Sequence, residues 1–153
     1  VWRFVAHLSD TDRADDLTQE TFLRAIGSLA AFEGHASARA WLFGVARNTV
    51  ADEVRRAGRR PQETRPGEWF DTRHAGTHSG SPAVELRAVL AQLDADRREA
   101  FVLTQLLGFS YAETAQVCGC AVGTIRSRVA RARAHLLELW PLGDETAVRR
   151  KVD

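Results

Sequence analysis

The stretch that decides the fold is Val122-Gly-Thr-Ile-Arg-Ser-Arg-Val-Ala-Arg-Ala-Arg133. Its apolar residues, continued to residue 136, recur at spacings of three and four, which places them on one face of an α-helix. The arginines of the stretch must then lie on the remaining faces. The face that we expect to be buried consists of Val122, Ile125, Val129, Ala132 and Leu136.

The residues before this helix predict a helix-turn-helix. Ser110-Tyr-Ala-Glu113 is a capping box, which starts a short helix, and Cys118-Gly-Cys120 supplies the tight turn after it. The second helix of such a motif enters the major groove, where arginine pairs with guanine and hydroxyl groups bind phosphates. An ordinary helical hairpin is the weaker interpretation, because acidic residues would normally be interspersed on its polar surface.

The rest of the chain also favours helices, so the predicted fold class is all-α. In the second half, Ser81-Pro82 favours a helix start, Asp94 or Asp96 can cap the next helix, and Gly108 ends it. Strand-like alternation of apolar and polar residues is absent from the sequence.

The first half predicts two helices, one around residues 15–29 and a longer one over residues 37–57. Asp15 and Asp16 suit the positive end of the first helix. We expect its buried stripe to consist of Leu17, Phe22, Ala25, Ile26 and Leu29.

Proline, glycine and small polar residues divide the chain into two small helical domains joined by a flexible linker. The predicted boundaries are residues 1–60 for the first domain, 61–81 for the linker, 82–140 for the second domain and 141–153 for a tail. Methionine is absent, and we expect the first domain to be truncated at its N-terminus.

Charge is concentrated although the net charge is only +1. Residues 10–20 hold five acidic residues against one arginine, a local charge of −4, whereas residues 54–60 and 121–135 each hold four arginines and no acidic residue. A single charged stretch is as often a solvated helix face as a binding surface. Two basic helices and an acidic one in the same chain favour binding to nucleic acid and to a protein.

The segment from Trp41 onward adds aromatic residues to arginines, a combination that suits unstacked bases of single-stranded DNA. Taken alone, Trp41 and Phe43 are better interpreted as core residues. Asn48 differs, because a polar residue within an apolar run needs a partner or a function.

Four motifs, in this order and spacing, resemble the extracytoplasmic-function (ECF) group of sigma-70-like bacterial sigma factors. They are Asp15-Asp-Leu-Thr-Gln-Glu-Thr-Phe22, Trp41-Leu-Phe-Gly-Val-Ala-Arg-Asn48, Leu107-Gly-Phe-Ser-Tyr-Ala-Glu-Thr-Ala115 and the stretch of residues 122–133. The resemblance implies a sigma-two and a sigma-four domain. It also implies a factor that binds core RNA polymerase and directs transcription initiation at promoters.

The resemblance implies roles for individual residues. The face that meets the β′ clamp helices of polymerase would include Asp16, Gln19, Glu20 and Leu23. The minus-ten element would contact Phe32, Arg47, Asn48, Arg55, Arg56 and Arg59. The minus-thirty-five element would contact Thr124, Arg126, Ser127, Arg128, Arg131 and Arg133.

The expected partners are therefore core RNA polymerase, through its β′ clamp helices and β flap, and promoter DNA. Whether an anti-sigma factor binds is left open. No catalytic residue, metal ligand, cofactor or membrane association is expected. Two cysteines cannot hold a secreted scaffold together, so a cytoplasmic location is expected.

A stand-alone helix-turn-helix regulator is the main alternative, and it would require a dimer and a palindromic site. An enzyme is less favoured, because the sequence lacks a phosphate-binding GxxxxGK[ST] loop, HExxH and GxSxG. Cys118 and Cys120 could bind a metal or form a redox pair, although packing inside the turn is the preferred interpretation.

Overall fold

The structure is a computed structural model that describes residues 1–34, 37–59 and 82–139, and these residues form helices and connecting turns without a strand. The first half contains α1 (Trp2–Leu8), α2 (Thr11–Ser28), the short 3-10 helix η1 (Leu29–Ala31) and α3 (Ala38–Arg59). The second half contains α4 (Pro82–Leu90), α5 (Ala95–Phe101), the π-helical turn η2 (Val102–Leu106), α6 (Tyr111–Cys118) and α7 (Val122–Leu139). The all-α prediction is confirmed. The predicted linker and tail lie entirely outside the described residues.

The helix ends follow local capping signals in the sequence. Asp94 accepts a hydrogen bond from the backbone N–H of Arg97 at 2.9 Å and so begins α5, which selects Asp94 over Asp96 as the cap. The long helix α3 starts where the Ser37 hydroxyl accepts the N–H of Ala40 at 3.1 Å. It runs two residues beyond the predicted end at residue 57.

The predicted buried stripe of α2 is only partly correct. Leu17 and Ala25 are buried, but Phe22 is 45% exposed, Ile26 71% and Leu29 59%. The helix packs on one side only, against α1 and α3, and the residues on that side are Ala14, Leu17, Thr21 and Ala25. A row of apolar side chains therefore remains on the free side of α2.

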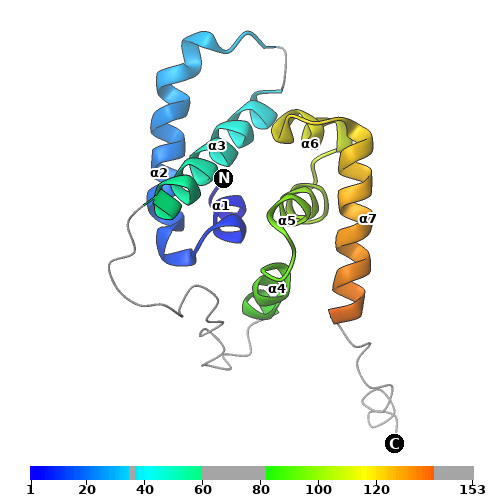
Figure 1. Cartoon of the computed structure of the whole chain (residues 1–153). Coiled ribbons are helices and arrows are strands. Elements are labelled where there is room, and N and C mark those ends of the chain that lie inside the picture. Colours follow the sequence, from blue (N-terminus) through cyan, green and yellow to red (C-terminus); the bar gives the residue numbers. More distant parts are fainter. Residues whose placement is uncertain (35–36, 60–81, 140–153) are drawn as a thin grey trace, which may run out of the picture.

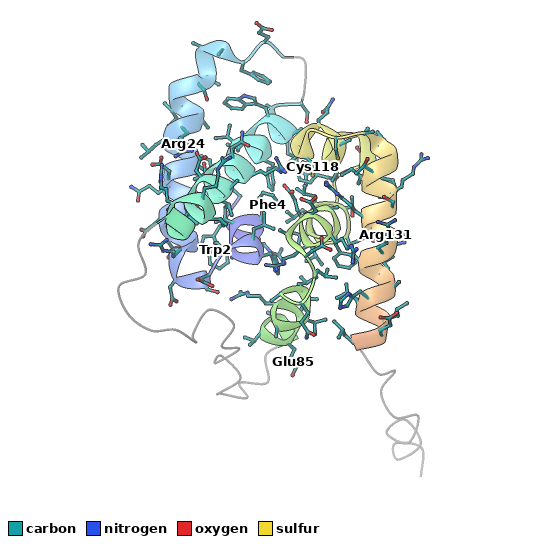
Figure 2. All side chains as sticks on the ribbon, viewed as in Figure 1. Trp2, Phe4, Arg24, Glu85, Cys118 and Arg131 are labelled. Atoms are coloured by element: carbon teal, nitrogen blue, oxygen red, sulfur yellow. The ribbon has the colours of Figure 1, made fainter. Side chains whose placement is uncertain are left out.

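The two halves pack against each other along a seam in which α3 contacts α6 and α1 contacts α5 (Figure 1). Three phenylalanine rings form a row that reaches across it, and the contact between Phe43 and Phe109 joins the two halves. Phe4 of α1 lies 5.3 Å from Phe43 of α3, and Phe43 lies 4.8 Å from Phe109, which precedes α6. Figure 2 shows Phe4 near the centre of the molecule. One hydrophobic cluster therefore includes buried residues of both halves.

Polar contacts accompany the rings. The Arg39 guanidinium lies 3.8 Å from the centre of the Phe109 ring and also donates a hydrogen bond to the Leu107 carbonyl. Arg47 Nε lies 2.7 Å from Glu99 Oε1. Burial raises the pKa of Glu99, and the Arg47 guanidinium opposes that rise. The seam thus combines ring packing, a cation–π contact and a buried ion pair.

We expect Phe109→Ala to lower the free energy of unfolding by about 3–5 kcal/mol, because it removes a buried ring that packs on both Phe43 and Arg39. Urea denaturation followed by circular dichroism measures this. Leu137→Ala is the control, since Leu137 is 67% exposed and its loss should change stability by less than about 0.5 kcal/mol. Equal effects of the two substitutions would contradict the packing described for the seam.

Candidate nucleic-acid interface

The helix-turn-helix forms as predicted. Ser110 and Glu113 make both hydrogen bonds of the capping box at the start of α6. Gly119 ends that helix at φ 64°, a left-handed conformation that glycine adopts without steric cost. The chain thereby turns sharply into α7. This helix packs on α5 and α6, and its residues Ile125 and Val129 are buried in the hydrophobic core. Of the predicted apolar stripe of α7, Ile125, Val129 and Ala132 are buried, Leu136 is half-buried, and Val122 at its start is 36% exposed.

Two of the four arginines of α7 are engaged within the second half. Arg128 forms an ion pair with Asp96 of α5, approaches the Cys120 sulfur at 3.7 Å and is only 22% exposed. Arg133 donates a hydrogen bond to the Gln105 side chain at 2.6 Å. Both guanidinium groups therefore help to hold α7 on the body of the second half.

The other two arginines face solvent. Arg126 and Arg131 are exposed, and neither bonds to another residue of the described chain. Figure 2 places Arg131 on α7, at the edge of the molecule far from α2. Ser127 is exposed beside them and donates to the Thr124 carbonyl at 2.9 Å, while Thr124 itself is half-buried. This face of α7 presents two free guanidinium groups and a hydroxyl.

A second candidate surface surrounds Asn48 on α3. The Asn48 side chain is exposed and borders a hollow of about 280 Å³ together with Trp41. Phe32 packs on Trp41 with ring centres 5.1 Å apart. Phe43, by contrast, is a core residue, as its interpretation from the sequence suggested. The structure thus brings Phe32, Trp41 and Asn48 together.

The arginines of α3 are less free than the sequence indicated. Arg55 Nη2 lies 2.6 Å from Asp52 Oδ1, and Arg56 Nη1 lies 3.8 Å from Glu53 Oε2. The side chain of Arg59 lies outside the described residues. Arg47, as described above, is paired with Glu99 in the seam. The basic stretch of residues 54–60 is therefore partly neutralised by the acidic residues just before it.

The predicted polymerase-binding residues share one face of α2. Asp16, Gln19 and Leu23 are exposed on this face, with 59% of the apolar Leu23 residue open to solvent. Glu20 is half-buried, and its carboxylate accepts a hydrogen bond from Arg24 Nε at 2.7 Å. The exposed apolar residues Phe22, Ile26 and Leu29 extend this surface, which the sequence prediction missed by assigning them to the core.

Both halves match models of one protein family. The model of sigma-70 region 2 matches residues 1–60, and the model of sigma-70 region 4 matches residues 83–136. The ECF RNA polymerase sigma factor SigC of Mycobacterium tuberculosis (strain CDC 1551 / Oshkosh) is 57% identical over 141 residues, which cover 90% of this chain and 75% of that protein. The chain belongs to the ECF sigma factors.

Other similar proteins and solved structures are also sigma factors. The ECF sigma factor EcfG of Rhodopseudomonas palustris is 43% identical over 132 residues, which cover 85% of this chain and 72% of that protein. Among solved structures, the sigma factor RpoE of Bartonella quintana in complex with the anti-sigma factor NepR matches with a TM-score of 0.75 and 34% identity, over 94% of this chain and 91% of that one. CnrH in complex with the cytosolic domain of CnrY matches with a TM-score of 0.68 and 28% identity, over 94% and 81%.

Family membership confirms the interpretation drawn from the four motifs. Sigma factors bind core RNA polymerase and promoter DNA and act in transcription initiation, so the stand-alone regulator is not favoured. The runs of residues 103–108 and 118–124, which also resemble actinobacterial sigma factor C, fit the similarity to mycobacterial SigC. These similarities do not by themselves assign roles to individual residues.

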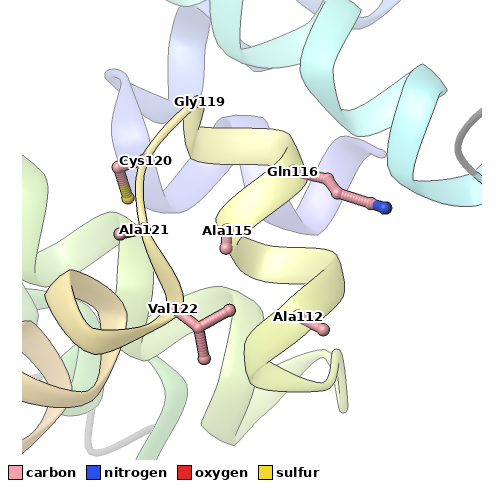
Figure 3. A pocket seen from close by; sticks show the side chains of 7 residues that line it. All are labelled: Ala112, Ala115, Gln116, Gly119, Cys120, Ala121 and Val122. Carbon is pink, nitrogen blue, oxygen red and sulfur yellow. The ribbon is translucent and has the colours of Figure 1, made fainter.

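The two cysteines of this sigma factor lie in the turn of the helix-turn-helix, and neither forms a disulfide. Figure 3 shows Cys120 in the short connection that leads from α6 into α7, next to Gly119. Burial raises the pKa of the Cys118 thiol to about 12. In the part of the chain that the structure describes, no group of three metal-ligating side chains comes together, and no helix has the length and apolarity of a membrane span.

We expect iodoacetamide at pH 8 to alkylate Cys120 at least about tenfold faster than Cys118, because only the thiolate reacts and Cys118 is both buried and protonated. Tandem mass spectrometry of the shared peptide assigns the label to one residue. The same reaction in denaturing urea is the control, and there the two rates should converge. Equal rates in the folded protein would show that the Cys118 thiol is accessible.

Proposed function

We propose that this sigma factor contacts the minus-thirty-five element of promoter DNA through the exposed face of α7. The observation that carries the proposal is the pair of unengaged guanidinium groups of Arg126 and Arg131, with Ser127 between them. Arginine can donate two hydrogen bonds to guanine in the major groove, and a serine hydroxyl can bind a phosphate. Thr124 supports this face from the N-terminal turn of the helix.

In this proposal Arg128 and Arg133 are positioning residues. Their guanidinium groups already bind Asp96 and Gln105, so reaching DNA would require these contacts to break. The ion pair of Arg128 with Asp96 connects α7 to α5, and these two helices pack against each other. The four basic residues of one helix thus divide into two that face DNA and two that hold the helix in place.

The hollow on α3 is the proposed site for an unstacked base of the minus-ten element. Asn48 offers an amide edge, and Trp41 with Phe32 offers aromatic surface. Arg55, Arg56 and Arg59 would guide the DNA backbone along the C-terminal end of α3. Arg47 would join them after its pair with Glu99 is broken, which requires the seam to open there.

The exposed face of α2 is the proposed docking surface for the clamp helices of core polymerase. Its acidic residues Asp16 and Glu20 suit a basic partner, and Leu23 adds apolar area at the centre of the face. Gln19 completes the set. Contacts of the second half with the β flap are part of the same proposal.

An anti-sigma factor is a further proposed partner. It is supported by the two solved structures described above, in which the sigma factors are bound to NepR and to the cytosolic domain of CnrY. We assign the protein no catalytic activity and place it in the cytoplasm, where polymerase and promoters are found.

Weak binding by the isolated factor is expected from the small number of free cations on the described part of α7. Two phosphate or base contacts by Arg126 and Arg131 correspond to a salt slope of only about −2 for the second half. Attachment of both halves to one polymerase raises the effective concentration of each half at its promoter element. Promoter affinity is therefore expected to depend on polymerase.

Run-off transcription with purified core polymerase tests the proposed function. The factor should yield a promoter-dependent product that core polymerase alone does not make. Leu23→Ala should lower its affinity for core polymerase by about tenfold, because an exposed apolar contact is lost while the fold is retained. Gln92→Ala, an exposed residue between α4 and α5, is the control and should bind normally. Absence of a specific product would contradict the proposal.

Arg126→Ala and Arg128→Ala should separate the two classes of arginine. We expect Arg126→Ala to weaken binding to a minus-thirty-five duplex by about 1–3 kcal/mol without changing the melting temperature. Arg128→Ala should lower the melting temperature, because the Arg128 side chain is only 22% exposed and its removal loses packing between α7 and α5 together with the ion pair. Gel-shift titration and thermal unfolding measure the two effects. An unchanged duplex affinity for Arg126→Ala would remove that residue from the interface.

A further inference from the structure

The hollow next to Asn48 is built by both halves of the molecule. Five of its lining residues belong to α3, and the sixth, Gln116, belongs to α6 on the other side of the seam. The members from α3 are Ala40, Trp41, Gly44, Val45 and Asn48. Figure 3 shows the Gln116 side chain leaving α6 on the side away from Cys120 and the turn. Gln116 thus faces the hollow from the second half.

The polar groups of the hollow are two free amides. Asn48 and Gln116 are both exposed, and neither side chain bonds to another residue that the structure describes. Each amide carries one acceptor oxygen and two N–H donors. Because these two amides come from α3 and α6, the hollow offers donors and acceptors from both halves to a ligand that carries both.

The remaining lining suits a flat, neutral group. Trp41 is half-buried and offers aromatic surface, while Gly44 contributes no side chain and a Cβ there would meet nothing within 4 Å. None of the lining residues is charged. A volume of about 280 Å³ lies just below the usual range for drug-sized ligands, so it has room for one nucleobase and not for a dinucleotide.

We infer that this hollow is a composite site for the base of a free purine nucleoside, bound while the two halves are packed together. Adenine fits best, because asparagine and glutamine amides pair with its N6 and N7 atoms and its ring can stack on an indole. The inference rests on the proposed function in one respect, since Asn48 is also the residue proposed to meet a promoter base. Its own element is Gln116.

A ligand held by both walls would bind the packed arrangement better than a separated one. Binding would therefore stabilise the seam by mass action and compete with the promoter base for Asn48. A small nucleoside would in this way act on the sigma factor before polymerase or promoter is engaged.

Adenosine titration of the free, full chain tests the inference. Resonances of the Asn48 and Gln116 side-chain amides should shift in two-dimensional NMR, with a dissociation constant in the millimolar range expected for so small and open a site. Gln116→Ala should weaken binding about tenfold. Its fold should be unaffected, because the side chain is exposed and bonds to no described residue. Gln92→Ala, which lies outside the hollow, should bind adenosine like the parent protein.

Three results would overturn the inference. The first is the absence of any shift at about 10 mM adenosine, well above the expected dissociation constant. The second is equal affinity of Gln116→Ala and parent with loss of binding in Asn48→Ala, which would place the base site on the first half alone. The third is equal binding of purine riboside, which lacks the N6 amino group, because binding would then depend on stacking without the amides.

The proposed function is tested separately by the same variant. On polymerase, Gln116→Ala should support run-off transcription at the parental level, since promoter contact does not use the packed seam. Failure of run-off by the parent protein would contradict the proposed function and leave the adenosine result standing. Failure of adenosine binding alone would contradict only the composite site.

Discussion

The contact of Phe43 with Phe4 on one side and Phe109 on the other is the interaction on which the rest of the structure depends. Each half is about sixty residues long, a size at which one core is only marginally sufficient. Sharing these rings lets both halves contribute to a single hydrophobic cluster. The same packing brings α6 against α3, so residues of the helix-turn-helix come next to Asn48. The arrangement of the candidate sites is thus a consequence of how the core is completed.

Local signals explain why the second half was predicted well from the sequence. The capping box at Ser110, the left-handed turn at Gly119 and the stripe through Ile125 each depend on residues within a few positions of one another. The stripe of α2 failed because helical periodicity cannot say which side of an apolar helix a neighbour will cover. Exposed Phe22, Ile26 and Leu29 recur at helical spacing just as buried Leu17, Thr21 and Ala25 do, and only the positions of α1 and α3 decide which of the two rows is covered.

The arginines show that local sequence patterns also fail to reveal distant partners of charged residues. Asp52 and Glu53 stand three residues before Arg55 and Arg56, so those surface pairs could have been predicted from spacing alone. The partner of Arg47 in the seam and that of Arg128 in α5 are distant in sequence, and no local pattern reveals them. A count of basic residues therefore overstates the charge available to DNA. Identity as a sigma factor came from ordered motifs and not from that count.

Arg24 has a consequence that reaches beyond α2. Its guanidinium holds Glu20 at 2.7 Å and Asp52 of α3 at 2.6 Å, and the other oxygen of Asp52 holds Arg55. These three ion pairs connect the surface proposed for polymerase to the surface proposed for the promoter. Withdrawal of Glu20 by a docking enzyme would let Arg24 compete more strongly for Asp52 and so liberate the cation at the far end. Polymerase binding and DNA affinity would then be coupled through these four side chains.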